Sequence, residues 1–219
     1  MDVNLDFITE DDILTDYRGT DKKVVIPEGI EGIDDGVFYK RADIESVVIP
    51  EGVVSIGNSA FFKCTSLTEI NIPESVAIIE SSAFYGCTGL KKIYIPAKVA
   101  MIDWRVFTKC TGLERIDVSE DNADYSSVDG VMFTKGGNVL RYYPAGRPGE
   151  EYTVPEGVLN ISIFSFKSCH TLKYLTIPES VETIDPGVFD ENTEITLRVK
   201  KHSPAYKYAL EYNINFELV

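Results

Sequence analysis

The sequence has few of the residues that carry common catalytic and binding chemistry. Its 219 residues include two histidines, four cysteines and one tryptophan. The 21 lysines and arginines are outnumbered by 35 aspartates and glutamates, which gives a formal net charge of −14. Nucleic acids and anionic lipids are recognised through clusters of Lys and Arg, so the acidic balance argues against both as partners. The hydrophobic share of 44% is nevertheless high enough to build a substantial core.

Long hydrophobic segments are also missing. Residues 99–102 form an apolar run of four, and no run is longer. A membrane span needs about 20 apolar residues and the core of a signal peptide roughly 7 to 15. Met1 is followed by Asp2 and Asp6, whose charge is opposite to that of a secretory leader. The chain is therefore expected to have no membrane insertion and no signal peptide, which leaves open a cytoplasmic protein or one whose leader has been removed.

What the sequence has instead is a repeat of 23 residues. Prolines recur at this spacing up to Pro96, and Ser119 occupies the next position of the series. The series resumes at Pro155, 36 residues after Ser119, which is one unit of 23 residues plus 13 extra residues. One unit is therefore expected to carry an insertion. The prolines of the series are Pro27, Pro50, Pro73, Pro96, Pro155 and Pro178.

Other columns keep the same register. Valine or isoleucine stands three residues after each proline, isoleucine six after it, phenylalanine eleven after it, and leucine or isoleucine seventeen after it. Cysteine stands fourteen after the proline in four units, with Arg41 and Asn192 in the end units. Apolar columns with such a period indicate a solenoid, in which each unit makes one turn and stacks on its neighbours.

Each unit is expected to contain a short strand and a short helical turn. Residues 70–72 and 93–95 alternate apolar and polar side chains and end at the proline, which has no N–H for a ladder. These strands are predicted to pair in parallel between turns. Asp103 and Asp185 stand where a helix N-cap would be, and Pro186 follows at the first helical position, which predicts the helical turn.

The two ends are expected to be capped, because a solenoid otherwise exposes its core and its strand edges. Residues 7–14, with an acidic middle, predict a hairpin at the first turn. At the other end, Ser203 as N-cap and Pro204 at the first helical position begin a helix that Asn213 can end in the left-handed region.

The insertion contains Asp129-Gly130 and Gly136-Gly137-Asn138, which mark two tight turns. It is expected to be a small meander that protrudes from one edge. The predicted organisation is one solenoid domain over residues 1–219, with a hairpin cap over 1–22, repeats over 23–118, a repeat with the hairpin insertion over 119–154, repeats over 155–200, and a helix–strand cap over 201–219.

The repeated unit resembles a known family. Residues 56–73 and 79–96 share Ala-Phe, then Cys, then Leu, then a closing Ile-x-Ile-Pro, and are similar to the BspA-type leucine-rich repeat. Residues 125–144 are similar to a hairpin insert of that family, and residues 203–213 to its C-terminal cap. The final unit departs from the pattern, since it lacks Cys and its strand over residues 195–199 is shifted by one residue.

The resemblance implies an α/β repeat solenoid, a leucine-rich-repeat-like right-handed coil of short parallel strands and short helical turns, with an inserted β-hairpin and capped ends. It also implies secreted or cell-surface proteins of host-associated bacteria that act by adhesion and by binding other proteins. No catalytic residues come with this family.

No catalytic, cofactor or metal site is predicted. The cysteines fit no zinc spacing and occupy a core column, so four buried free thiols are expected. The segment that begins at Asp117 has the opening spacing of a calcium loop but lacks its glycine and its bidentate glutamate. His170 and His202 are interpreted as surface residues. Trp104 replaces a small polar residue of other units, and it either packs against the convex face or anchors an interaction.

The candidate binding surface is the outer face of the strands. Residues two and four before each proline point away from the core, and aromatic and arginine side chains on rigid surfaces are common anchors for protein partners. The central candidates are Tyr94, Lys92 and Arg115. The rest of the predicted face is Asn71, Glu69, Asp117, Tyr174 and Thr176.

These observations predict a noncatalytic protein-binding or adhesion module, not an enzyme, that presents a rigid sheet face to a protein partner from a host or a cell surface. One alternative is a repeat scaffold with a hydrolase-like site at the insertion of residues 120–150, which converging titratable groups with displaced pKa values would reveal. The other is a structural spacer within a larger surface protein. The resemblance favours an extracellular or cell-surface location, and the sequence predicts no oligomeric state.

Overall fold

Short strands recur twice in each 23-residue unit of the computed structural model, which describes residues 6–219. Strands of the first set end close to the proline column, and strands of the second set end at the isoleucine six residues after it. The first set comprises β3 (Lys23–Val25), β5 (Ser46–Val48), β7 (Glu69–Ile70), β9 (Lys92–Ile95) and β11 (Arg115–Val118). The second comprises β4 (Gly32–Ile33), β6 (Ser55–Ile56), β8 (Ile78–Ile79) and β10 (Met101–Ile102).

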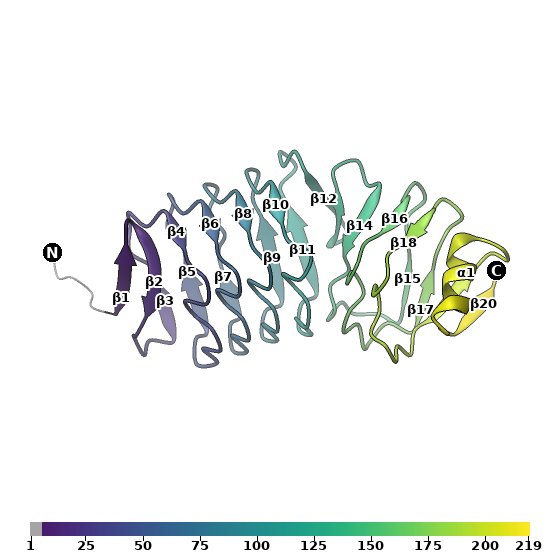
Figure 1. Cartoon of the computed structure of the whole chain (residues 1–219), viewed down its shortest axis with the longest axis horizontal. Coiled ribbons are helices and arrows are strands. Elements are labelled where there is room, and N and C mark those ends of the chain that lie inside the picture. The colour runs from purple at the N-terminus through teal and green to yellow at the C-terminus, as the bar shows by residue number, and fades with distance from the viewer. Residues whose placement is uncertain (1–5) are drawn as a thin grey trace.

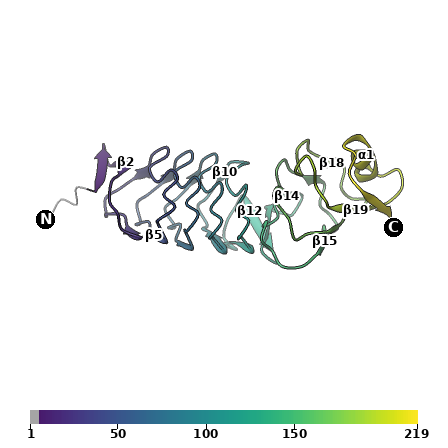
Figure 2. The same ribbon diagram turned by 90° about the horizontal axis from the view of Figure 1, so that it is seen from below.

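Neighbouring turns pair in parallel with the register of the repeat. Val24 lies opposite Val47, and Ile56 lies opposite Ile79. About nine turns stack into an elongated, gently curved β-solenoid (Figure 1), and the perpendicular view shows the same stacking along the long axis (Figure 2). The predicted parallel strands are confirmed. The second strand set was not predicted, because two-residue strands carry too little sequence pattern to be recognised.

The long turn that follows the second strand is not helical, so the predicted helical turn is wrong. Alternate backbone N–H groups of this turn donate to carbonyls of the next coil: Phe61 N donates to Ala83 O at 2.8 Å, and Lys63 N to Tyr85 O at 2.7 Å. The N–H groups between them donate three residues back, as Phe62 N does to Ser59 O at 3.0 Å. Ser59 and Lys63 both have a left-handed φ of 55°, which a right-handed helix does not allow. Hydrogen bonds between coils thus replace the helix, and the α/β description reduces to a β-solenoid with one helix among residues 6–219.

The insertion joins the stack instead of protruding from it. It forms an antiparallel meander of β12 (Tyr125–Val128), β13 (Val131–Thr134) and β14 (Val139–Tyr142), and β14 then pairs in parallel with β16 (Asn160–Ile161) and, through it, with β18 (Thr183–Ile184). Val131, Met132 and Phe133 are buried. The predicted protrusion is therefore wrong, because apolar side chains on both faces of β13 find cores on either side. Met132 packs in the N-terminal core cluster and Phe133 in the C-terminal one.

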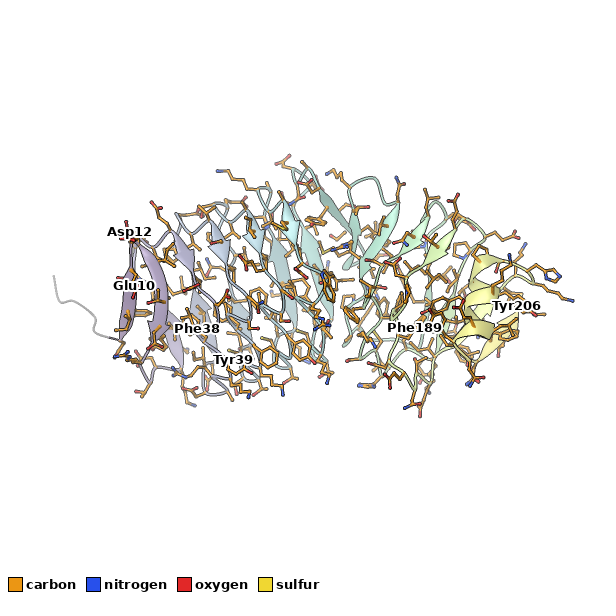
Figure 3. All side chains as sticks on the ribbon, in the orientation of Figure 1. Glu10, Asp12, Phe38, Tyr39, Phe189 and Tyr206 are labelled. Atoms are coloured by element: carbon orange, nitrogen blue, oxygen red, sulfur yellow. The ribbon has the colours of Figure 1, made fainter. Side chains whose placement is uncertain are left out.

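An inner column of phenylalanine rings runs through the core. The rings of Phe38, Phe61 and Phe84 are stacked, with centroids 5.0 and 5.3 Å apart and interplanar angles of 5° and 2°. The column continues beyond the insertion with Phe166 and Phe189, and Figure 3 labels its two end members, Phe38 and Phe189. Phe61 and Phe84 are covered by their equivalents in the turns on either side, and tyrosine rings cover the column at its ends and at the insertion. In this way a turn too small to bury its own side chains acquires a core.

The cysteine column lies beside the inner phenylalanines. Cys64 Sγ lies 3.1 Å from the carbonyl oxygen of Phe38, and Cys87 Sγ lies 3.1 Å from that of Phe61, so each thiol donates to the preceding turn. All four cysteines are free and buried, which confirms the prediction. Burial raises the pKa of Cys64 and of Cys110 to about 12, so these thiols carry no charge at neutral pH.

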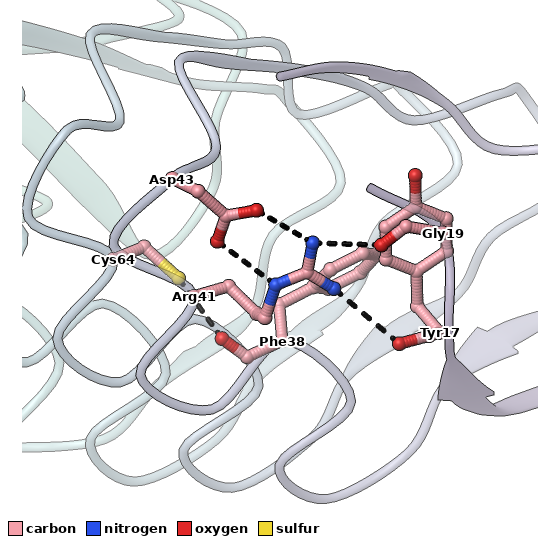
Figure 4. A network of polar contacts seen from close by, with 6 residues as sticks. All are labelled: Tyr17, Gly19, Phe38, Arg41, Asp43 and Cys64. Atoms are coloured by element: carbon pink, nitrogen blue, oxygen red, sulfur yellow. Dashed lines mark hydrogen bonds and ion pairs between the residues drawn. The ribbon is translucent and has the colours of Figure 1, made fainter. Parts of the chain in front are cut away.

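Arg41 stands in the cysteine column of the first unit, where it ties the N-terminal hairpin to the solenoid (Figure 4). The hairpin consists of β1 (Phe7–Glu10) and β2 (Ile13–Tyr17), as expected for this segment, and residues 1–5 of the predicted cap lie outside the described residues. The Arg41 guanidinium donates to the carbonyl of Gly19 at 2.8 Å and to the carbonyl of Tyr17 at 3.4 Å. It also pairs with Asp43, which raises the pKa of Arg41.

In the C-terminal half the strands before the proline column form a separate sheet, followed by the one helix found among residues 6–219. β15 (Glu151–Thr153), β17 (Tyr174–Thr176), β19 (Thr196–Val199) and β20 (Phe216–Leu218) form one parallel sheet, and α1 (Pro204–Glu211) lies beside it at the end of the molecule (Figure 1). The Ser203 hydroxyl caps α1 by accepting from Tyr206 N at 3.1 Å, and Asn213 has a φ of 53°. Tyr174 lies opposite Thr196, which confirms the one-residue shift of the last unit.

Candidate protein-binding face

The outer face of the first strand set is built by simple alternation. Along β9, Lys92 and Tyr94 are exposed while Ile93 and Ile95 are buried in the core. Tyr94 keeps 49% of its surface exposed, and Val48 on β5 also keeps 49%. Because parallel pairing with the repeat register places equivalent positions side by side, these outward residues form stripes across the face.

The first strand set opens between β7 and β9. These two strands belong to different sheets, although β8 and β10 in the same two turns remain paired. Ile70 is half-buried, whereas its column neighbours Val47 and Ile93 are each only 2% exposed. The opening is a groove of about 660 Å³. The predicted residues that line it are Glu69, Asn71, Lys92, Tyr94 and Asp117, and Val48 and Ile70 contribute apolar surface.

The side chain of Asn71 holds one side of this groove. Its Nδ2 donates to the carbonyl of Ile49, and its Oδ1 accepts from the N–H of Ile49, both at 2.8 Å. Valine occupies the same position in the two preceding turns, as Val25 and Val48, and has no group that could make these bonds. The end of β7 is therefore fastened to the preceding turn, on the side away from β9.

Arg115 lies beside the groove and does not line it. Its Nε and Nη2 donate to the carboxylate of Asp117 at 2.8 and 2.6 Å, and this hydrogen bonding raises the pKa of Arg115. Lys92 lies opposite Arg115 in the ladder and makes no ion pair with any residue between 6 and 219. The unneutralised cation at the groove is thus Lys92, while the arginine proposed as an anchor has its charge paired.

Tyr174 and Thr176 lie elsewhere. They belong to β17, in the sheet that follows the insertion. The guanidinium carbon of Arg198 lies 4.2 Å from the centre of the Tyr174 ring, and Arg198 also pairs with Glu151 and Glu217. The structure therefore brings five of the eight predicted residues to one groove, leaves Arg115 at its margin and places two on a second surface. No sequence signal distinguishes Ile70, because its column is apolar in every unit.

Two tyrosines of the insertion, Tyr142 and Tyr143, have raised pKa values because their side chains are packed inside the protein. Burial raises the pKa of Tyr143 to about 12 and also raises that of Tyr142. The Tyr142 hydroxyl donates to the carbonyl of Asp103 at 2.6 Å and accepts from Val106 N at 3.1 Å, which joins the insertion to the preceding turn. Within residues 6–219, no three His, Cys, Asp or Glu side chains are grouped to hold a metal ion.

No helix in the described part of the chain has the length and apolar character needed to cross a bilayer.

Comparisons with known proteins support the repeat architecture. A family model described as BspA type leucine-rich repeat region matches six copies over residues 20–134 and 147–215. A leucine-rich cell surface protein from Faecalibacterium prausnitzii has a similar structure, with a TM-score of 0.62 and 24% identity over 87% of this chain and 73% of that one. A leucine-rich repeat protein from Eubacterium ventriosum gives a TM-score of 0.54 and 24% identity, covering 88% of this chain and 63% of that one.

The pneumococcal vaccine antigen PcpA is similar with a TM-score of 0.67 and 28% identity over 74% of this chain. The match covers 46% of the PcpA chain, so the present chain spans about half the length of that structure. No curated protein matches the sequence.

Proposed function

Since the chain belongs to the BspA-type leucine-rich repeat family, we propose that it is a noncatalytic binding module whose groove between β7 and β9 receives a segment of a partner protein. The groove is the observation that carries the proposal. It exposes Tyr94, Val48 and Ile70 on a backbone held by ladders and by the inner core. A rigid, partly apolar depression with an exposed aromatic side chain is the usual setting of an interface hot spot.

The charges around the groove define the partner segment further. Lys92 is exposed and unpaired within residues 6–219, and Glu69 lies on the neighbouring strand. A matching segment places an apolar side chain between Tyr94 and Ile70 and a carboxylate near Lys92. The backbone of the groove is already held by the ladders and loses little conformational entropy on binding, which favours affinity.

A surface or secreted location is part of the proposal. The Faecalibacterium prausnitzii protein with a similar fold is described as a cell surface protein, and PcpA is described as a vaccine antigen. Adhesion to a host or neighbouring cell would then be the role of the binding module.

The enzyme alternative at the insertion is not favoured. Burial is the main cause of the raised pKa values of Tyr142 and Tyr143, and the Tyr142 hydroxyl is hydrogen-bonded to the backbone of the preceding turn. The spacer alternative predicts an outer face on which substitutions have no effect on binding.

The test compares two matched variants in capture experiments from extracts of host-cell surfaces. Tyr94→Ala removes the groove aromatic, and Tyr174→Ala removes an aromatic from the outer face of the other sheet. A captured protein should bind the Tyr94→Ala variant at least about 30-fold more weakly, as expected for a hot spot of about 2 kcal/mol, and should bind the Tyr174→Ala variant as it binds the unmodified protein.

Circular dichroism should show that both variants remain folded, because each side chain is outside the core. Loss of binding with Tyr174→Ala and its retention with Tyr94→Ala would assign the interaction to the sheet that contains β17 and refute the proposal. Unchanged binding with both variants would also refute it, and failure to capture any protein would favour the spacer.

A further inference from the structure

The repeat shows which residue types the solenoid needs at each position. Four departures from the repeat lie in the turns on either side of the insertion. The residue eight positions after the proline is small or aliphatic in most units, but it is Trp104 in one unit. The residue nine positions after the proline is Gly or Ser in most units, but it is Arg105 in one unit and Phe164 in another. Twelve residues after the proline the first three units have aromatic rings, but the unit after the insertion has Lys167. Solenoid packing does not require any of these four side chains.

A second column of aromatic rings, here called the outer column, runs along the solenoid to the turns that carry these four residues. The rings of Tyr39, Phe62 and Tyr85 are stacked along one edge of the solenoid, with centroids 4.9 and 4.8 Å apart. Figure 3 labels Tyr39 next to Phe38, the first member of the inner column. Lys40 and Lys63 place their amino groups over Tyr39 and Phe62, at 4.9 and 5.7 Å from the ring centres. The edge therefore combines aromatic surface with positive charge on a chain whose net charge is −14.

The outer column ends in a pocket of about 270 Å³. Tyr85 and Phe164, from turns on either side of the insertion, contribute aromatic surface to its lining. Behind it, Trp104 stacks on Phe164 with ring centroids 5.2 Å apart, while remaining 40% exposed. Trp104 therefore packs, as one sequence interpretation expected, but against a ring of a turn that lies beyond the insertion.

Three cations line the pocket and are only weakly neutralised. The Arg105 guanidinium carbon lies 4.6 Å from the Trp104 ring centre and 5.3 Å from that of Phe164, and Lys109 Nζ lies 5.8 Å from that of Tyr85. Neither Arg105 nor Lys109 forms an ion pair with any residue from 6 to 219. Lys167, the third, reaches one carboxylate oxygen of the lining residue Asp190 at 3.8 Å.

One further polar side chain of the lining, that of Thr108, has no hydrogen-bond partner. The Oγ1 atom of Thr108 is buried and makes no hydrogen bond within the described structure. A buried hydroxyl without a partner costs free energy, and a ligand group that bonds to it removes that cost.

We propose that this pocket binds an acidic sugar residue of a glycan. A carboxylate or sulfate group would lie among Arg105, Lys109 and Lys167, because planar guanidinium and ammonium groups are the usual donors to such anions. The sugar hydroxyls would bond to Asp190 and Thr108, and the apolar face of the sugar ring would lie against Tyr85 or Phe164. An acidic sugar has an anionic group, hydroxyl groups and an apolar ring face. These match the cations, the polar side chains and the aromatic rings of the lining.

A nucleic acid fits this site less well. Its affinity would come from many phosphate contacts, whereas the pocket offers three cations on a protein with a net charge of −14. The pocket is formed by different elements from the groove between β7 and β9, so it is independent of the proposed protein-binding function.

The test measures binding of four probes to the folded chain: a heparin tetrasaccharide, a hyaluronan tetrasaccharide, neutral chitotetraose and a 12-residue oligo-dT. At least one of the two acidic sugars should bind, and chitotetraose should not. The triple variant Arg105→Gln, Lys109→Gln, Lys167→Gln should lose at least about tenfold in affinity, as expected when charge-assisted hydrogen bonds are removed. Comparison of the heparin and hyaluronan probes shows whether sulfate or carboxylate is preferred.

A control triple variant, Lys98→Gln, Lys201→Gln, Lys207→Gln, has the same net charge and substitutes exposed lysines that do not line the pocket. It should bind the acidic sugar within about twofold of the unmodified protein. Thr108→Val, which keeps the shape of the side chain, should weaken sugar binding severalfold without lowering thermal stability, because the hydroxyl has no partner in the free protein.

Three results would overturn the proposal: equal losses in the two triple variants, oligo-dT binding as tightly as the better acidic sugar, or no binding of either acidic sugar. Tyr94→Ala should leave sugar binding unchanged, so the two proposed sites succeed or fail separately.

Discussion

The inner aromatic column should carry much more of the stability than the outer column beside it. The substitution that tests this is Phe61→Ala. Phe61 is 0% exposed, and its ring lies between those of Phe38 and Phe84, with centroids 5.0 and 5.3 Å away. Removing a fully buried phenylalanine costs about 3 to 5 kcal/mol through lost transfer free energy and the cavity that remains. We expect a loss in the upper part of this range, because the flanking turns are held by ladders and cannot collapse into the space.

The next residue along the chain provides the control. Phe62 is half-buried, and its ring is stacked between Tyr39 and Tyr85 at 4.9 and 4.8 Å. Both substitutions remove the same side chain from the same turn and from a stack of two neighbours, so their main difference is burial. Phe62→Ala should cost about 1 to 2 kcal/mol, which reflects partial burial and two exposed ring contacts.

The assay is urea unfolding at 25 °C, followed by circular dichroism and by the fluorescence of Trp104, the single tryptophan. Circular dichroism reports on the whole chain and Trp104 on the turns around the insertion. Coinciding transitions would justify a two-state free energy of unfolding, and separate transitions would report the two halves individually. A free energy loss for Phe61→Ala no larger than that for Phe62→Ala would refute the assignment of the inner column as the core.

Three further predictions concern the cap, the thiols and the insertion. Arg41→Ala should lower the stability of the N-terminal hairpin by about 1 to 3 kcal/mol, since it removes charge-assisted bonds to two carbonyls; faster hydrogen exchange confined to β1 and β2 would show this, and unchanged exchange there would contradict it. In the folded protein all four buried thiols should react slowly with a thiol reagent at pH 8 and should count four after denaturation. The pKa of Cys64 and Cys110 is about 12 in the folded chain against an ordinary value of 9.0, so their contribution to stability should be complete below pH 9 and should be lost as the pH rises towards 12. Urea titrations of Cys110→Val should show a smaller loss of stability at alkaline pH than those of the unmodified protein, and a loss of equal size would argue against this role of the thiol. Tyr142→Phe should destabilise the junction at the insertion by about 1 to 3 kcal/mol, because it leaves the N–H of Val106 without its buried partner; a Trp104 fluorescence transition unchanged in urea would be inconsistent with that role.

Several features of the fold followed from the sequence because they depend on position along a one-dimensional repeat. The 23-residue period placed Phe61 and Phe84 in one buried column and predicted the parallel register that pairs Val24 with Val47. The cap residues Ser203 and Pro204 were recognisable because capping is a local interaction between a side chain and the next backbone N–H groups. Five of the residues that line the groove were predicted as outward-facing because strand alternation is local as well.

Other features depended on contacts that no local pattern records. The helical turn expected in each unit gave way to turns in which alternate N–H groups, such as those of Phe61 and Lys63, bond to the next coil, so these bonds form only when the neighbouring turn is present. The opening at Ile70 arises where β7 and β9 belong to separate sheets, although the apolar column in which Ile70 lies is unbroken in the sequence.

The sequence by itself determined the stacking, the core columns and the outward stripes, since a strict period makes every turn bury the same positions. Only the tertiary structure decided where the stack departs from that period. It placed the insertion inside the core because β13 has apolar side chains on both faces. It also joined Trp104 to Phe164 across the insertion, because contacts between distant residues follow from how the coils pack and not from their spacing along the chain.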